Sequence, residues 1–97
     1  MFVVRNVFQT HPGKAKELVA KFKAASPHMQ SEGVRNTRIL TDVAAGFWTV
    51  VIESETDDLG AFVRAVETMG EKPELRAAMA GYMDLVQEGR REIFRVE

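Results

Sequence analysis

The order of hydrophobic periods along the chain is its most informative feature. Strand-like patterns of apolar residues occur at 2–9 and again at 92–96. Between them the period changes to that of a helix, then of two strands, then of a second helical region. The pattern therefore predicts an α+β chain of β-α-β-β-α-β order, with one domain over residues 1–97.

Turn and cap residues divide this pattern into elements. Thr56-Asp57-Asp58 offers a helix N-cap, and Pro73 suits the first turn of a new helix. The predicted elements are a strand over 2–9, a helix over about 13–26 that distorts at Pro27, strands over 34–41 and 47–55, a helix from about 58, a break at 70–73, a further helical stripe to about 86, and a last strand over 92–96. The third strand is the most apolar and β-branched, which favours a central place in the sheet.

Both crossovers in such a chain are right-handed, so the helices cover one face of a four-stranded antiparallel sheet. We expect the apolar face to meet them. That face is predicted to carry Phe2, Val4, Phe8, Trp48, Val50, Ile52, Phe94 and Val96.

The opposite face of the sheet is mixed in character. Val3, Val7, Ile39, Phe47, Val51 and Ile93 alternate there with Arg5, Gln9, Arg35, Thr37, Glu53, Arg91 and Arg95. A solvated face alternates more cleanly to polar residues, so we expect a second copy of the chain to cover this one. The predicted dimer face comprises Val3, Arg5, Val7, Phe47, Val51, Glu53, Ile93 and Arg95. The alternative is a monomer whose open sheet face is amphipathic. A one-residue shift in the register of a strand would exchange the residues assigned to its two faces.

The amino-acid composition limits the kinds of partner and site that the sequence favours. The net charge of −1 gives no electrostatic reason to expect nucleic acid or an anionic membrane, and no apolar stretch has the length of a membrane span. No cysteine is present, which excludes disulfides and thiol chemistry. His11 and His28 lack metal-ligand spacing, so no metal site is expected. No signal peptide is recognisable, and we expect a cytoplasmic location.

Two segments carry a family resemblance: Arg5-Asn6-Val7-Phe8 followed by Pro12-Gly13-Lys14 and Leu18, and the run Arg91-Glu92-Ile93-Phe94-Arg95. With them the chain resembles the dimeric α/β-barrel (ferredoxin-like) superfamily, and within it the small NIPSNAP-like proteins. The antibiotic-biosynthesis and haem-degrading monooxygenases are more distant relatives. The resemblance implies a homodimer whose two sheets pack face to face, with a pocket in each subunit between sheet and helices.

Asn6 is the most specific residue of this resemblance. It is similar in place to the strand-one asparagine that haem-degrading members use near the bound cofactor. It is also a polar amide between Val4 and Phe8, so it needs hydrogen bonds from the protein, from water or from a ligand. The helix-two tryptophan and histidine of those enzymes have no counterpart over residues 59–88, and we therefore expect no haem and no other cofactor.

The sequence thus predicts binding of a small apolar or aromatic molecule. The expected pocket comprises Asn6, Phe8, Trp48, Phe62, Val66, Met79 and Tyr82. Two alternatives stay open: a cofactor-independent monooxygenase-like enzyme with Asn6 and Tyr82 as candidate catalytic residues, and a structural or regulatory dimer whose pocket is packed shut. An RNA-binding role is disfavoured, since the open face offers no aromatic residue for base stacking other than Phe47.

Overall fold

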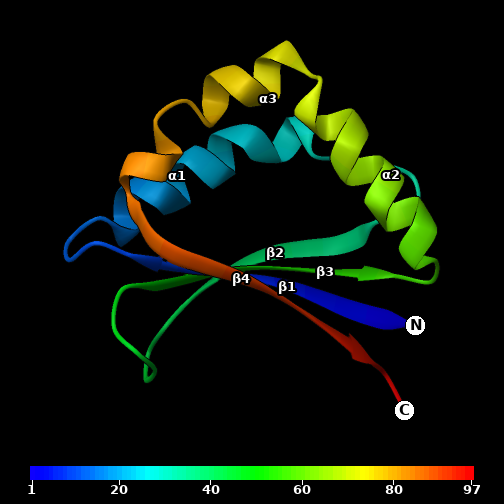
Figure 1. Ribbon diagram of the computed structural model, residues 1–97, viewed down its shortest axis with the longest axis horizontal. Helices are drawn as coiled ribbons and strands as arrows, with labels where there is room; N and C mark the ends of the chain where they lie inside the picture. The colour runs from blue at the N-terminus through cyan, green and yellow to red at the C-terminus, as the bar shows by residue number, and fades with distance from the viewer.

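A computed structural model, which describes residues 1–97, contains one antiparallel four-stranded sheet with three α-helices on one of its faces (Figure 1). In chain order the elements are β1 (Phe2–Thr10), α1 (Ala15–Ala25), a 3₁₀ turn (Ser26–His28), β2 (Arg35–Thr41), β3 (Thr49–Thr56), α2 (Leu59–Gly70), α3 (Pro73–Ala78), a second 3₁₀ turn (Tyr82–Asp84) and β4 (Val86–Arg95). This order confirms the predicted ferredoxin-like β-α-β-β-α-β fold.

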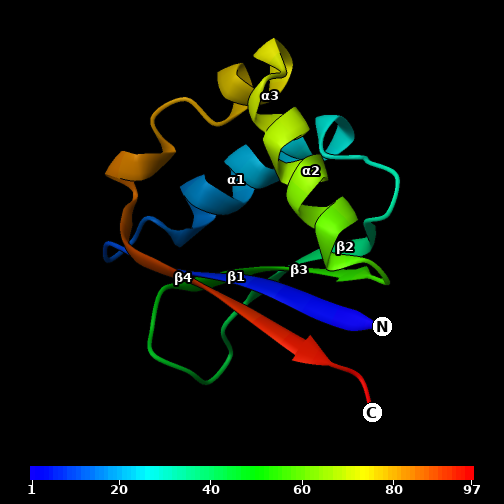
Figure 2. The same ribbon diagram turned by 45° about the vertical axis from the view of Figure 1, so that its right-hand side comes forward.

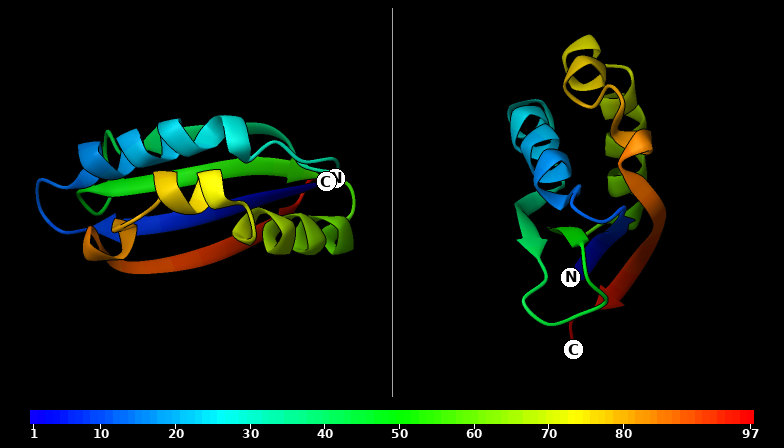
Figure 3. Two further views of the ribbon diagram at one scale, coloured as in Figure 1. Left: turned by 90° about the horizontal axis from the view of Figure 1, so that it is seen from above. Right: turned by 90° about the vertical axis from the view of Figure 1, so that its left-hand side faces the viewer.

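The strands lie in the order β2-β3-β1-β4, so the apolar strand β3 is central, as its composition predicted. Seen from above, α1 and the pair α2–α3 run side by side over the sheet (Figure 3). The helices are not all at the same height above the sheet, because α3 stands further from it than α1 does (Figure 2).

The core lies between α1 and the central strands. Leu18 and Phe22 are four residues apart on α1 and face the sheet together, where they pack with Val50, Ile52 and Leu85. All five side chains are buried, and Leu18 and Val50 have no exposed surface. This cluster holds α1 tightly against the sheet and leaves the cavity on the side of α2.

The caps of the second helical region explain where it begins and ends. Oδ1 of Asp58 accepts hydrogen bonds from the backbone N–H groups of Gly60 (2.9 Å) and Ala61 (3.2 Å), which confirms the predicted N-cap. The predicted stripe to residue 86 is wrong, because α3 ends at Ala78. Gly81 has a φ of +81°, a left-handed conformation that no helix continues through, and the chain turns there into β4.

The register of β4 overturns part of the predicted face assignment. Ile93 lies opposite Val4 and Arg95 opposite Phe2, so both belong to the helix-covered face and not to the predicted dimer face. Phe94 lies opposite Val3 on the open face, again contrary to prediction. Ile93 and Phe94 are adjacent apolar residues, so alternation alone does not choose between them, and the pairing with β1 decides.

Strands β2 and β3 show two further differences from the prediction. Ile39 lies opposite Ile52 and packs on the helix-side core, so it does not belong to the open face. Phe47 and Trp48 precede β3 and adopt φ angles of +42° and +56°, which break the strand before Thr49. Phe47 is therefore a loop residue, 76% exposed, and not part of the sheet face where the sequence placed it.

Candidate functional site

A cavity of about 340 Å³ lies between the sheet and the α2–α3 arm. Most of its wall is apolar, which is typical of sites for small organic molecules. Six residues of the predicted pocket lie around it: Asn6, Phe8, Phe62, Val66, Met79 and Tyr82. The rest of its lining is Phe22, Met29, Val34, Thr37, Ile52, Ser54, Met69, Gly70, Leu75, Arg76 and Arg91.

The spacing of residues within each strand or helix determines which side chains form the walls of the cavity. Asn6 and Phe8 alternate along β1 onto the helix side, and Phe62 and Val66 lie one turn apart on α2. The chain then bends at Glu71 and Lys72, and Pro73 starts α3 in a new direction. That bend carries α3 over the cavity as a roof instead of laying it on the sheet.

Trp48 is the predicted pocket residue that lies elsewhere. It borders a separate hollow of about 600 Å³ between α1 and the β2–β3 loop, where Phe47 and Lys16 also lie. Nine residues line this hollow, and 17 line the cavity under α2 and α3. The left-handed backbone at Trp48 places this residue in the loop before β3 and not in the strand, where the sequence predicted it.

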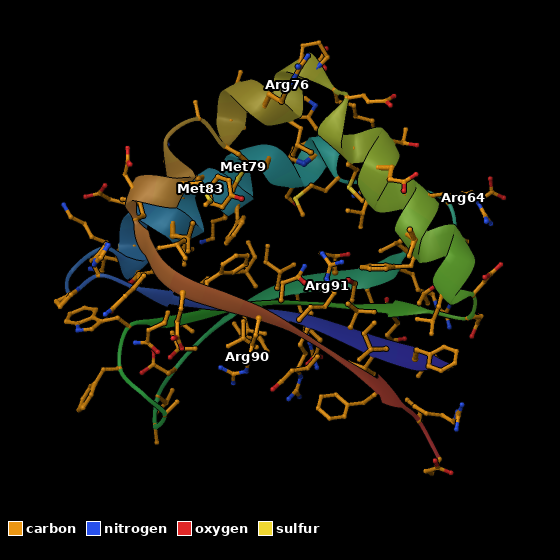
Figure 4. The ribbon with its side chains drawn as sticks, in the orientation of Figure 1. Arg64, Arg76, Met79, Met83, Arg90 and Arg91 are labelled. Atoms are coloured by element: carbon orange, nitrogen blue, oxygen red, sulfur yellow. The ribbon has the colours of Figure 1, made fainter.

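Asn6 forms a hydrogen bond with an arginine in the wall of the cavity. Arg91 lies directly opposite Asn6 in the β1–β4 ladder, and its Nε donates a hydrogen bond of 2.7 Å to Oδ1 of Asn6. The central guanidinium carbon of Arg91 lies 5.4 Å from the centroid of the Phe62 ring, within the range of a cation–π contact. Figure 4 shows Arg91 between the sheet and the helices, whereas its neighbour Arg90 points to the opposite side.

The sequence interpretation missed Arg91 as a cavity residue, because it placed this side chain on the open face. Arg76 on α3, which also lines the cavity, was missed as well. The positions of the two arginines depend on the strand register and on the angle of α3, and neither leaves a signal in a single sequence. The cavity lining contains no Asp or Glu, so both positive charges face it without a counter-charge.

No metal centre forms around the histidines. His11 and His28 do not line the cavity, and no group of three or more His, Cys, Asp and Glu side chains is arranged to hold a metal ion. The cavity lining contains no histidine.

The open face of the sheet carries an ion-pair cluster, whose members are Arg5, Arg38 and Glu53. Glu53 is buried and accepts hydrogen bonds from Nε of Arg5 (2.7 Å) and Nε of Arg38 (2.9 Å). These bonds, first from Arg38 and then from Arg5, hold the pKa of Glu53 below its usual value of 4.5. Apolar side chains surround the cluster, among them Val3, Val7, Val51 and the half-exposed Phe94.

No protein-family model matches the sequence, and no curated protein matches it. No helix combines the length and the apolar character needed to cross a bilayer. Solved structures give a clearer result. An uncharacterised NIPSNAP domain protein from Burkholderia xenovorans superposes with a TM-score of 0.83 at 15% identity, over 100% of this chain and 95% of that one.

Two monooxygenase-type structures are also similar. One is a putative antibiotic biosynthesis monooxygenase from Chloroflexus aurantiacus (TM-score 0.67, 14% identity, 99% and 94% of the two chains). The other is a MhuD variant with two manganese protoporphyrin IX molecules bound per active site (TM-score 0.74, 19% identity, 99% and 94%). At these identities the likeness concerns the fold, so this chain has a NIPSNAP-like, ferredoxin-like fold related to that of the antibiotic-biosynthesis monooxygenases.

Proposed function

We propose that this protein is a homodimer that binds a small apolar or aromatic molecule in the cavity between sheet and helices. The observation that carries the proposal is the cavity itself, about 340 Å³ with mainly apolar walls, into which only a few polar groups project. The alternative of a structural dimer predicted a pocket closed by Trp48, Phe62 and the methionines. Trp48 lies outside the cavity, which favours ligand binding over that alternative.

Filling the cavity tests the binding proposal. We expect Val66→Phe to weaken binding of a neutral aromatic probe, N-phenyl-1-naphthylamine, measured by its fluorescence increase in the wild-type protein. Val63→Phe is the matched control, because Val63 lies on the same helix and is 53% exposed, outside the cavity. Circular dichroism establishes that both variants are folded. Equal probe binding by folded Val66→Phe and by wild type would contradict the proposed site.

The dimer proposal is supported by the apolar residues around the Glu53 cluster. A shared interface would cover Val3 and Phe94, and removal of apolar surface from water drives most protein association. We expect sedimentation to give twice the 10.9 kDa mass of the chain, and Phe94→Asp to give the monomer mass. Val43→Asp in the β2–β3 loop is the control, since Val43 is fully exposed. A wild-type monomer at micromolar concentration would disprove the dimer.

A cofactor-independent oxygenase is the second candidate, and one observation favours it. Asn6 on the sheet and Tyr82 from the 3₁₀ turn after α3 line the same cavity, where they would orient an anionic substrate that itself reduces oxygen. With a panel of quinols, oxygen uptake by the wild type should be lost in Asn6→Ala while the dimer persists. Unchanged uptake in that variant removes Asn6 from the mechanism.

A further inference from the structure

We propose that the natural ligand of the cavity is an organic anion, with an apolar body and one carboxylate or similarly delocalised oxyanion that Arg91 binds. This inference rests on the proposed function, because it names the chemical class of the molecule that the cavity takes. Arg91 is exposed at one end of the cavity, so the charged group would lie at the opening and the apolar body further in.

The hydrogen bonds of Arg91 leave its binding end free. A guanidinium group has five N–H donors in a planar fork, and the Nε–H of Arg91 is used by Oδ1 of Asn6. Its two terminal nitrogens donate no hydrogen bond to the protein. The free edge is the one that binds a carboxylate through two parallel hydrogen bonds. Nδ2 of Asn6 also donates no bond within the protein and supplies a further donor beside it.

Most arginines of this chain are paired with a carboxylate, but Arg91 is not. Five of them lie within 4.0 Å of a carboxylate: Arg5, Arg35, Arg38, Arg64 and Arg90. Arg91, Arg76 and Arg95 have no such partner. Arg95 stacks on Phe2, outside the cavity lining, whereas Arg91 and Arg76 both line the cavity. Two arginines without a carboxylate partner therefore line a cavity whose lining contains no acidic side chain.

Two neighbours hold Arg91 in place before any ligand arrives. Asn6 fixes the Nε side of the guanidinium, and the ring of Phe62, which is 5% exposed, lies 5.4 Å from it. A donor group that is already oriented loses less conformational freedom on binding, which strengthens the complex. Asn6 is a positioning residue in this arrangement, in addition to any contact that it makes itself.

A matched pair of probes tests the inference. The titration uses 2-naphthoate and 2-naphthamide, which share one ring system and differ in charge, and follows binding by isothermal calorimetry. For the wild type we expect 2-naphthoate to bind about tenfold more tightly, or about 1.4 kcal/mol. In Arg91→Gln the two affinities should become equal, whereas Arg90→Gln, with its side chain on the other face, should keep the preference. Acetate, an anion without an apolar body, should not compete.

The outcomes separate this inference from the proposed function. Equal wild-type affinity for the two probes overturns the anion inference and leaves apolar binding intact. Loss of the preference in Arg90→Gln as well as in Arg91→Gln assigns it to general surface charge and also overturns the inference. Competition by acetate at similar concentration does the same. Binding of neither probe overturns the proposed function itself.

Discussion

Replacement of Glu53 by Gln measures what the ion-pair cluster on the open face contributes to stability. The Glu53 side chain is 8% exposed and accepts bonds of 2.7 Å from Arg5 and 2.9 Å from Arg38. Glutamine has nearly the same shape and keeps one carbonyl acceptor, but it removes the negative charge. The variant therefore removes the charge and one of the two acceptor oxygens, which Arg5 and Arg38 use separately, without creating a cavity.

The exposure of the two arginines limits the size of the effect. A hydrogen bond to a charged group contributes roughly 1.5–3 kcal/mol when it is well buried, and an exposed ion pair roughly 0–1 kcal/mol. The side chains of Arg5 and Arg38 are 44% and 66% exposed, so each pair belongs near the lower range. We expect Glu53→Gln to lower the free energy of unfolding by about 1–2 kcal/mol at pH 7.

The pH dependence of this difference has a defined sign. The pKa of Glu53 is lower in the folded protein than its usual 4.5, so the carboxylate stabilises the fold above the unfolded-state pKa. That stability is lost as the pH falls through the lower folded-state pKa, where wild-type Glu53 also becomes neutral. The gap between wild type and Glu53→Gln should therefore be full at pH 7 and shrink steadily below about 4.5.

Urea denaturation followed by circular dichroism, at pH 7, 5 and 3.5, measures the gap. All samples need one protein concentration, since dimerisation would raise the apparent stability. Glu55→Gln is the matched control, because Glu55 lies on the same strand and its nearest arginine nitrogen, Nε of Arg35, is 3.9 Å away. A gap that does not change with pH, or an equal loss in the control, would refute the reasoning.

Two further predictions concern the fold. Leu18→Ala should lower the free energy of unfolding by about 2–5 kcal/mol in urea denaturation, because Leu18 is fully buried in the core; a loss below about 1 kcal/mol would contradict the core assignment. Asp58→Ala should cost about 1 kcal/mol and lower the melting temperature, because two N–H groups of α2 lose their cap. Asn at the same position should restore most of that loss, and a failure to restore it would show that the cap is not the cause.

Much of the cavity could be predicted from the sequence, because the spacing of apolar residues within a helix or a strand determines which of them share a face. Phe62 and Val66 belong to one stripe of α2, and Asn6 and Phe8 to one face of β1. Arg91 could not be predicted in this way. Its position depends on which residue of β1 it faces, and a shift of one residue would move it to the other side of the sheet.

By itself the sequence determined the order of the elements, the central place of β3, the cap at Asp58 and the oddity of Asn6 among apolar residues. The order of the elements, the cap and the surroundings of Asn6 depend on residues that are near in the chain, and the central place of β3 follows from its apolar, β-branched composition. The tertiary structure alone decided that Arg91 meets Asn6, that Trp48 leaves the pocket, and that α3 forms a roof. Each of these depends on pairing or backbone geometry between distant segments, which the period of a single segment does not encode.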